Sequence, residues 1–330
     1  MGVRQFIRQY SLQVYSDGGV VLDLSQLRFA FMVRRGDWQT PNSADIRVYN
    51  VSDETAGRVQ SLTPKPEFNR VVINAGYDGN VGTIFDGQIK QVRRGRESQV
   101  DTFLDITGAD GDSAYNFSML AMSLAAGENT PANSVEQIVA RMGKYSVSQG
   151  YKPDFSTNPL PRGKVMYGMA RDELRKVGLN TQTSWSIQDG KLTFVPLTSY
   201  IEQGDIPVLT SATGMIGLPE QTQNGIRIKV LLNADLKIGQ AVKLDNASIQ
   251  QYRYSLAFNE QVSNQTNSAF IKTQSDGLYY VMLAEHSGDT RGQPWYTDLT
   301  CLAIDASIKP GYQQNSVMSQ DALTAIKRWG

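Results

Sequence analysis

Apolar and polar residues alternate with a period of two along most of the first 110 residues. Leu27, Phe29, Phe31 and Val33 are each separated by one intervening residue, the pattern of a strand that buries one face. The other segments with this pattern are 6–14, 44–48, 70–77, 83–93 and 100–108. Short strands in such close succession predict an antiparallel barrel or sandwich.

One helix is predicted within this block. The polar segment 52–62 can begin with Ser52 as its N-cap, and the carboxylates of Asp53 and Glu54 suit the positive end of a helix dipole. Pro64 follows, as is typical just beyond a helix end.

The period changes after residue 112, where helical spacing replaces alternation. Ser134 and Gln137 fit a capping box and apolar residues at helical spacing follow, which predicts a helix over 134–143. A second helix is predicted over 164–177, ending before Gly178. The proline-rich stretch between them, 151–162, predicts a loop or an extended connection.

A hairpin and a second set of strands complete the pattern. Residues 185–194 alternate around Asp189-Gly190, a pair suited to the positive φ angles of a type I′ turn. Strand patterns return from about residue 210, at 225–232, 242–244, 252–258, 269–272, 278–285 and 295–304.

This order predicts a β-rich α+β fold in which two antiparallel β-barrels flank a small α+β insertion. We place the first barrel at residues 1–111, the insertion at 112–209 and the second barrel at 210–309. Residues 310–330 form a polar C-terminal tail with one short apolar helical pattern.

Composition excludes several kinds of chemistry. The 330 residues include 32 Lys and Arg and 32 Asp and Glu, so the chain lacks the basic excess typical of nucleic-acid-binding proteins. The single cysteine, Cys301, excludes an internal disulfide and a multi-cysteine zinc site, and the single histidine, His286, excludes histidine-rich metal sites. Apolar runs are too short for a membrane span or a leader. We therefore expect no cofactor, no metal and no membrane insertion, and synthesis in a cytoplasm.

Two groups of residues offer a catalytic interpretation. His286 lies beside Ser287 and near acidic residues, but no Gly-x-Ser-x-Gly motif occurs, so we interpret it as a structural loop histidine. Asp105, Asp110 and Asp112 lack the spacing of an EF-hand loop. We interpret Asp110 and the glycine after it as a turn that closes a strand.

Two further groups offer a binding interpretation. The basic run 90–96 includes Arg93 and Arg94 but no interleaved aromatic residue, which favours a solvated or protein-contacting face over nucleic acid. Trp295 and Tyr296 could stack on sugars. Neighbours in a strand face opposite sides, however, so we expect one to lie in the core and the other at the surface or an interface.

Four strings occur in a recognisable order: 41–52, 76–89, 217–239 and 285–299. Together they resemble segments of the baseplate hub proteins of contractile-tailed bacteriophages, over roughly residues 41–304. The resemblance implies two barrels akin to the tail tube protein, joined by an α+β insertion. It also implies a homotrimeric ring in which six barrels imitate sixfold symmetry.

In that family such a ring meets the tail tube protein above and a trimeric spike protein below. The resemblance thus implies a structural virion protein of the tail baseplate, present in the host cytoplasm during assembly. Other baseplate proteins and the tape measure protein are further expected partners. DNA would pass through the lumen during ejection without specific recognition, and we expect no catalysis.

The residues that we expect at barrel edges or interfaces are Ile89, Arg93, Arg94, Arg227, Lys229, Trp295 and Tyr296. Three alternatives stay open. One is a peptidoglycan-degrading tail hydrolase that uses His286 or the aspartates near residue 110. The others are a sugar-binding β-sandwich that uses Trp295 or Tyr296, and a secretion-system hub with the same fold.

Overall fold

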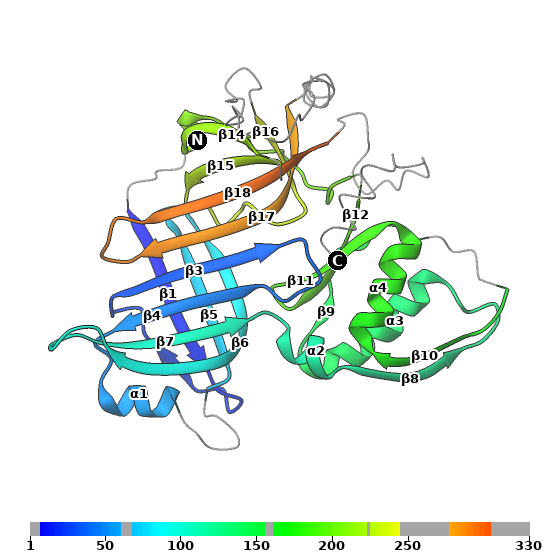
Figure 1. The fold of residues 1–330 in the computed structure, drawn as a ribbon, viewed down its shortest axis with the longest axis horizontal. Helices are drawn as coiled ribbons and strands as arrows, with labels where there is room; N and C mark the ends of the chain where they lie inside the picture. The colour runs from blue at the N-terminus through cyan, green and yellow to red at the C-terminus, as the bar shows by residue number, and fades with distance from the viewer. Residues whose placement is uncertain are drawn as a thin grey trace, which may run out of the picture.

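The computed structural model describes residues 7–60, 68–155, 161–197, 199–222, 225–244 and 277–304. The first β block, drawn from blue to cyan in Figure 1, follows the predicted strands closely. Its strands are β1 (Arg8–Tyr15), β2 (Val21–Asp23), β3 (Phe29–Gly36), β4 (Ser43–Tyr49), β5 (Arg70–Tyr77), β6 (Asn80–Arg96) and β7 (Thr102–Ala109).

The period-two pattern is confirmed in these strands. In β3, Phe29, Phe31 and Val33 are buried while Met32 between them is exposed. Burying one apolar face in this way contributes roughly 1.5–3 kcal/mol for each large side chain. The core of this block therefore lies on the inner face of the sheet, and the alternate residues face outward.

Helix α1 (Asp53–Val59) is confirmed with the predicted cap. The hydroxyl of Ser52 accepts a hydrogen bond from the Thr55 N–H at 3.2 Å, which satisfies one of the unpaired donors at the helix start. Ala56 and Val59 point into the first core, so the helix covers one end of the sheet.

The insertion packs helices against a short ribbon and a hairpin. Its elements are α2 (Asp112–Phe117), β8 (Met119–Leu124), α3 (Pro131–Met142), η1 (Gly143–Tyr145), β9 (Ser148–Gln149), β10 (Lys164–Met169), α4 (Ala170–Thr181), β11 (Thr183–Gln188) and β12 (Lys191–Pro196). It has a core of its own, in which Leu174, Trp185 and Phe194 are almost fully buried. The insertion is therefore a packed unit and not a long loop.

Both helices predicted in the insertion have different bounds in the structure. The first begins at Pro131 after Thr130, whose hydroxyl accepts from the Asn133 N–H at 3.1 Å, so Ser134 is a buried helical residue and not the N-cap. Residues 164–169 of the second prediction form β10, which pairs with β8.

The second helix, α4, starts at Ala170 and continues through Gly178. A side chain at Gly178 would meet the Thr183 carbonyl oxygen at 2.8 Å, so this glycine permits close packing of the helix and does not end it.

The hairpin prediction is confirmed. Strands β11 and β12 pair from Thr183 to Pro196, and Asp189 and Gly190 both have positive φ, 53° and 71°. A type I′ turn requires this combination.

The second β block contains β13 (Val208–Leu209), η2 (Ser211–Thr213), β14 (Met215–Thr222), β15 (Gly225–Leu231), β16 (Ala241–Leu244), β17 (Leu278–Asp289) and β18 (Trp295–Ala303). The strands predicted at 252–258 and 269–272, and the tail at 310–330, lie outside the described residues. His286 was expected in a loop, which is wrong, because β17 continues to Asp289 and the turn starts after it.

One sheet contains strands of both β blocks. Its order is β14-β15-β18-β17-β3-β4-β7-β6-β5-β1-β2, with β13 and β16 attached beside β17. Strands β3 and β17 join the blocks by antiparallel pairing, from Ala30 opposite Asp289 to Gly36 opposite Leu283. The first core also takes Trp295 and Leu232 from the second block, so the two blocks share packing as well as hydrogen bonds.

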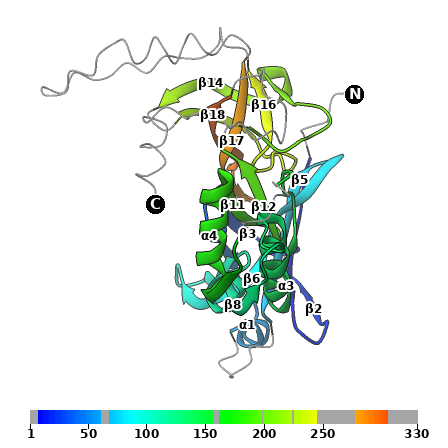
Figure 2. The ribbon, with the colours of Figure 1, turned by 90° about the vertical axis from the view of Figure 1, so that its right-hand side faces the viewer.

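The sheet turns back over its first core. In Figure 1, β18, β17, β3, β4 and β7 lie side by side while β1 and β5 cross behind them, and the insertion lies to one side. Figure 2 shows this side, with α3, α4 and the β11–β12 hairpin in front of the sheet. The rings of Tyr10 in β1 and Phe29 in β3 meet across the core, with 5.5 Å between their centroids. The β-rich α+β fold class, with antiparallel strands and a small α+β insertion, is confirmed.

Candidate functional site: the outer face of the sheet

The outward-facing residues of the sheet carry charges of both signs on neighbouring strands, mostly opposite in sign, although Asp298 and Glu285 bring two carboxylates face to face. One row crosses four strands, because Lys229 in β15 lies opposite Asp298 in β18, which lies opposite Glu285 in β17, which lies opposite Arg34 in β3. The Arg34 guanidinium lies 3.2 Å from the Glu285 carboxylate. Opposite charges on facing strands stabilise the pairing modestly, by roughly 0.2–1 kcal/mol a pair.

A second row centres on Asp105 of β7. Its carboxylate accepts hydrogen bonds from Arg47 of β4 at 2.8 and 3.1 Å and from Arg93 of β6 at 3.4 Å. The Arg47 guanidinium lies 4.2 Å from the centroid of the Phe103 ring, and its pKa is raised by the hydrogen bonds to Asp105. Arg93 itself is 67% exposed and therefore remains available to a partner.

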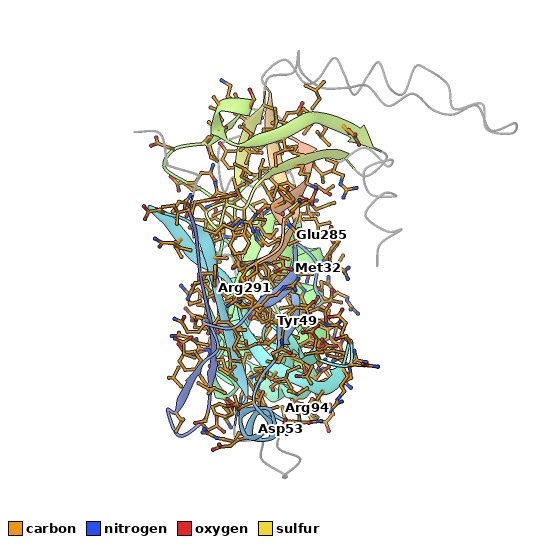
Figure 3. The ribbon with its side chains drawn as sticks, turned by 90° about the vertical axis from the view of Figure 1, so that its left-hand side faces the viewer. Met32, Tyr49, Asp53, Arg94, Glu285 and Arg291 are labelled. Atoms are coloured by element: carbon orange, nitrogen blue, oxygen red, sulfur yellow. The ribbon has the colours of Figure 1, made fainter. Side chains whose placement is uncertain are left out.

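Arg94, the next residue of β6, faces the other side of the sheet, toward α1. Arg94 forms an ion pair with Asp53 in the first turn of α1, and the Asp53 side chain is 86% exposed. Figure 3 shows Glu285, Met32, Tyr49, Arg94 and Asp53 along one side of the molecule, over β17, β3, β4, β6 and α1. Arg93 and Arg94 thus face opposite sides of β6, Arg93 opposite Asp105 on the outer face and Arg94 opposite the buried Leu104, and each has a carboxylate beside it.

The junction of the β blocks, where β3 meets β17, carries a further ion pair. Arg28 donates two hydrogen bonds to Asp289, at 2.7 and 3.2 Å, and its guanidinium lies 4.5 Å from the centroid of the Tyr49 ring. The pKa of Asp289 is lowered, chiefly by the hydrogen bond from Arg28. The backbone N–H groups of Arg291 and Gly292 also donate to this carboxylate, which fixes the turn after β17.

The second block presents two further cations, Arg227 and Lys229, on its outer face. Arg227 is 58% exposed and lies 3.9 Å from Asp298, a contact too loose to hold it firmly. The ammonium of Lys229 lies 4.5 Å from the centroid of the Tyr296 ring, a cation–π contact between outward-facing residues. Of the four residues predicted in this block, Arg227, Lys229 and Tyr296 are therefore outward-facing neighbours on β15 and β18.

Two of the predicted interface residues face inward. Trp295 is 1% exposed, packs edge-on against Tyr10 and Phe31, and donates from its indole N–H to the Gly76 carbonyl at 3.3 Å. Ile89 is partly buried against the same core. Trp295 is thus a core residue, because its ring fills the space where the two blocks meet, and Tyr296 is its outward neighbour.

The groups considered for catalysis hold the fold together. His286 is 1% exposed, its Nδ1 lies 2.9 Å from the Thr297 hydroxyl, and burial lowers its pKa to about 3. Asp110 accepts hydrogen bonds from the turn of the β11–β12 hairpin, and Asp112 pairs with Lys90 at 2.8 Å. At 1% exposure the imidazole of His286 faces other side chains of the core and not the surface.

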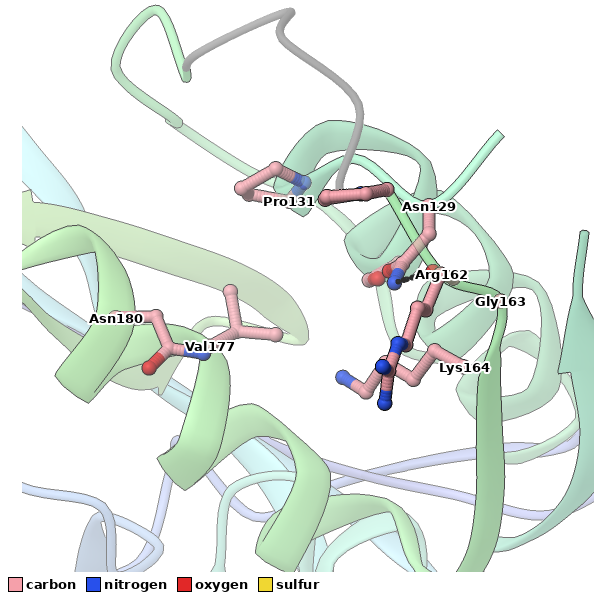
Figure 4. A pocket seen from close by; sticks show the side chains of 9 residues that line it. Asn129, Pro131, Arg162, Gly163, Lys164, Val177 and Asn180 are labelled. Atoms are coloured by element: carbon pink, nitrogen blue, oxygen red, sulfur yellow. Dashed lines mark hydrogen bonds between the residues drawn. The ribbon is translucent and has the colours of Figure 1, made fainter. Parts of the chain in front are cut away.

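A shallow cleft of about 420 Å³ lies between α3 and α4. Figure 4 shows Arg162 and Lys164 on one wall, with Val177 and Asn180 opposite. Its lining also includes Asn129, Pro131, Ser134, Pro161 and Gly163. The described lining holds no carboxylate, thiol or imidazole, so it offers no acid–base pair.

Groups of three or more potential metal ligands do not occur among the described residues. In the same part of the chain, no helix is long and apolar enough to cross a membrane.

Sequence reasoning missed the carboxylates of the outer face. Asp105 had been considered only for catalysis, and Glu285, Asp289 and Asp298 were not assigned to an interface. The available signal was the period-two pattern itself, which places alternate residues outward. Strand order, which brings Asp298 beside Lys229, is not contained in that pattern.

A family model for the baseplate hub gp41 matches residues 16–249. The chain belongs to that family. It is therefore related to structural components of the phage tail baseplate, in agreement with the resemblance seen in the sequence. Among curated proteins, no sequence matches the chain.

Solved structures with a similar fold are phage tail and secretion-system proteins. The 43 kDa tail protein of prophage MuSo2 from Shewanella oneidensis is 8% identical, with a TM-score of 0.55, covering 93% of this chain and all of that one. The tail protein from Neisseria meningitidis MC58 is 11% identical, with a TM-score of 0.54, covering 90% of this chain and 96% of that one.

The c3393 protein of E. coli, a component of the type VI secretion system, is also similar. It is 11% identical, with a TM-score of 0.50, and the match covers 88% of this chain and 76% of that one. At these identities the similarity establishes the baseplate hub fold and nothing finer.

Proposed function

We propose that this chain is the subunit of a homotrimeric baseplate hub that adapts a sixfold tail tube to a threefold central spike. The observation that carries the proposal is the presence of two β blocks joined in one sheet by β3 and β17. Three copies of a two-block subunit supply six blocks, which matches a sixfold partner on one side and a threefold partner on the other.

The outer face supplies the contact surface in this proposal. Arg93, Arg94, Arg227, Lys229 and Tyr296 contact neighbouring subunits or the tail tube protein, while Ile89 and Trp295 support these strands from inside. Exposed arginines that already have a carboxylate beside them can exchange that partner for one on another chain at little cost, because surface ion pairs are weak.

The balance of charge also suits a ring through which DNA passes. The described ion pairs combine Arg28, Arg34, Arg47 and Arg93 with carboxylates of the outer face, and Arg94 with Asp53 of α1. A surface with compensated charge has little net attraction for phosphate, so DNA moves through the channel without specific recognition. We place the protein in the virion, in a contractile tail, after assembly in the host cytoplasm with spike, tape measure and other baseplate proteins.

The absolute mass in solution tests the proposal. Three copies of the 36.5 kDa chain would weigh about 110 kDa. We expect light scattering to give this mass, either for the chain alone or after addition of the cognate tail tube and spike proteins. A chain that stays monomeric with both partners present contradicts the trimer.

A secretion-system hub is a second candidate, because the similar E. coli c3393 protein is a component of the type VI secretion system. Mass spectrometry of purified, DNA-filled particles separates the two. Detection of this chain in such particles supports the phage hub, and its absence favours the secretion system.

A further inference from the structure

Away from the outer face, one carboxyl group contacts all three parts of the chain. Asp37 directly follows β3 in the first block, and its carboxylate accepts hydrogen bonds from the Ser184 hydroxyl in the insertion and from the Tyr280 hydroxyl in the second block. Its backbone N–H donates to the Met282 carbonyl at 2.9 Å. Loss of this one side chain would thus loosen contacts among both blocks and the insertion.

A second carboxyl group of the first block holds the tip of the insertion hairpin. Asp110 follows β7 and is 2% exposed, and its two oxygens accept from the backbone N–H groups of Asp189 and Gly190 at 2.6 and 2.9 Å. These two donors belong to the type I′ turn between β11 and β12. The hairpin is therefore held by a carboxyl group at its base and by another at its tip.

The other charged groups around Asp110 come from three elements. Arg35 of β3, 4% exposed, donates to Asp189 at 2.9 Å and to the Ile84 carbonyl at 3.3 Å. Lys237 of the second block donates to the Thr83 carbonyl at 3.1 Å and lies 3.6 Å from Asp189. His286 is buried within the field of these groups and is neutral because its pKa is lowered.

The two cations at this junction face Asp189 and not Asp37. In the described part of the chain no ion pair involves Asp37, whose carboxyl group faces only the Ser184 and Tyr280 hydroxyls. Burial without a cation disfavours the charged form of a carboxyl group. Burial accordingly raises the pKa of Asp37 to about 6 and that of Asp110 to about 7, against the hydrogen bonds that lower both.

These raised pKa values make the equilibrium between the closed and the opened junction depend on pH. In the closed junction both carboxyl groups hold a proton more tightly than they would in water, where a pKa near 3.8 applies. Between about pH 4 and 7 the closed junction therefore binds more protons than an opened one. Acid therefore favours the closed junction. This stabilisation of the closed form is lost as the pH rises through the raised pKa values of Asp37 and Asp110.

We propose that Asp37 and Asp110 form a proton-linked latch that holds the insertion hairpin between the two β blocks, tight in acid and loosened as the pH rises to neutrality. The latch acts within a single chain and does not depend on the proposed ring. The angle between the insertion and the sheet that the two β blocks share would then respond to the pH of the surroundings.

Hydrogen exchange of the full chain tests the latch, read on the amides of residues 183–196 and corrected for intrinsic exchange rates. From pH 5 to pH 8 we expect hairpin opening to increase about tenfold through Asp37, with a further increase of up to about a hundredfold through Asp110. Asp37→Asn mimics the protonated carboxyl group, so the increase in hairpin opening from pH 5 to pH 8 should become about tenfold smaller in this variant. The double variant Asp37→Asn, Asp110→Asn should abolish it.

Asp172→Asn is the matched control, because this exposed carboxylate on α4 lies away from the hairpin and pairs loosely with Arg175 at 3.9 Å. It should leave the full response intact. An unchanged response in the double variant, or no response in the unaltered chain, overturns the latch.

A measurement on the unaltered chain covers the case in which the variants do not fold. Carbon-13 NMR of aspartate-labelled protein should show two carboxyl groups that titrate between about pH 5.5 and 7.5. Titration of every aspartate near pH 4 or below also overturns the proposal.

Discussion

Trp295 joins the two β blocks at the scale of a single side chain. It belongs to the second block, yet its ring packs against Tyr10 and Phe31 of the first, and its indole N–H reaches the Gly76 carbonyl of β5. A side chain at Gly288 would come within 2.8 Å of this ring, so the neighbouring strand has no room to shift. The indole thus fills the space between the two β blocks, on the inner face of the sheet.

Trp295→Ala should therefore lower the free energy of unfolding by about 3–5 kcal/mol, because it leaves a cavity and removes the hydrogen bond to the Gly76 carbonyl. Urea unfolding followed by circular dichroism measures this loss. Tyr296→Ala, one residue along and facing outward, should cost about 1 kcal/mol or less. Equal losses for the two variants would contradict the assignment of Trp295 to the core.

His286 predicts a pH dependence of the opposite sign to that of the latch. Its pKa falls from 6.5 to about 3 on folding, so between these values the unfolded chain binds more protons than the folded one. Its contribution to stability is present above pH 6.5 and is lost as the pH falls toward 3. The slope approaches about 1.4 kcal/mol per pH unit.

His286→Gln keeps a group that can bond the Thr297 hydroxyl but does not titrate. We expect the difference in unfolding free energy between this variant and the unaltered chain to change with pH only below about 6.5. Urea titrations from pH 4 to 8 provide the curve. A difference that is constant over this range would show that the imidazole is not buried in its neutral form.

At the scale of elements, hydrophobic periodicity located most strands, because each buries one face and exposes the other. It failed for β10, where the short string from Lys164 to Met169 has apolar residues at spacings that suit a helix or a strand equally. Pairing with β8, about 40 residues earlier along the chain, decides between them. The cap of α3 was also missed, because Thr130 and Pro131 give a start signal as strong as Ser134.

Two glycine substitutions should change the stability of the fold in opposite directions. Gly57 lies inside α1 with open space around the position of a Cβ atom, so Gly57→Ala should stabilise the helix by about 0.5–1 kcal/mol. Gly190 occupies the hairpin turn at a φ of 71°, so Gly190→Ala should destabilise by about 1–2 kcal/mol.

Thermal unfolding of both variants checks the pair. Gly204→Ala is the control, because Gly204 lies in open space without a positive φ and should have little effect. Destabilisation by Gly57→Ala would contradict the position of α1.

At the scale of the whole molecule, sequence periodicity predicted two β blocks and an insertion but not how they join. The pairing of β3 with β17 brings together residues about 250 positions apart, and one chain carries no local signal for such a register. The candidate surface was incomplete for the same reason. Arg93 and Arg94 stood out as a basic run, whereas Asp105 and Asp53 became their partners through strand order and helix placement.

Charge reversal at Arg93 and Arg94 should impair assembly while the fold survives. Glutamates at both positions place like charges beside Asp105 and Asp53, but one member of each pair, Arg93 or Asp53, is largely exposed, so the cost is about 1 kcal/mol. At an interface the same change repels the partner and slows association. Light scattering with the cognate tail tube protein should therefore show less complex, with unaltered circular dichroism.

The double variant Arg141→Glu, Lys144→Glu changes the same charge on the insertion, at the end of α3, and should assemble normally. Equal assembly by both double variants would remove Arg93 and Arg94 from the interface.

The seam between β3 and β17 also dictates the order in which the chain can fold on the ribosome. The Phe29 N–H bonds to Thr290, 261 residues later, so β3 stays without its second neighbour while nearly the whole chain is made. At about 5–20 residues per second, that delay lasts on the order of ten to fifty seconds. Throughout it the nascent first block offers an open strand edge to any other extended segment, including those of chains on neighbouring ribosomes. Translation speed is thus a determinant of the yield of folded subunits.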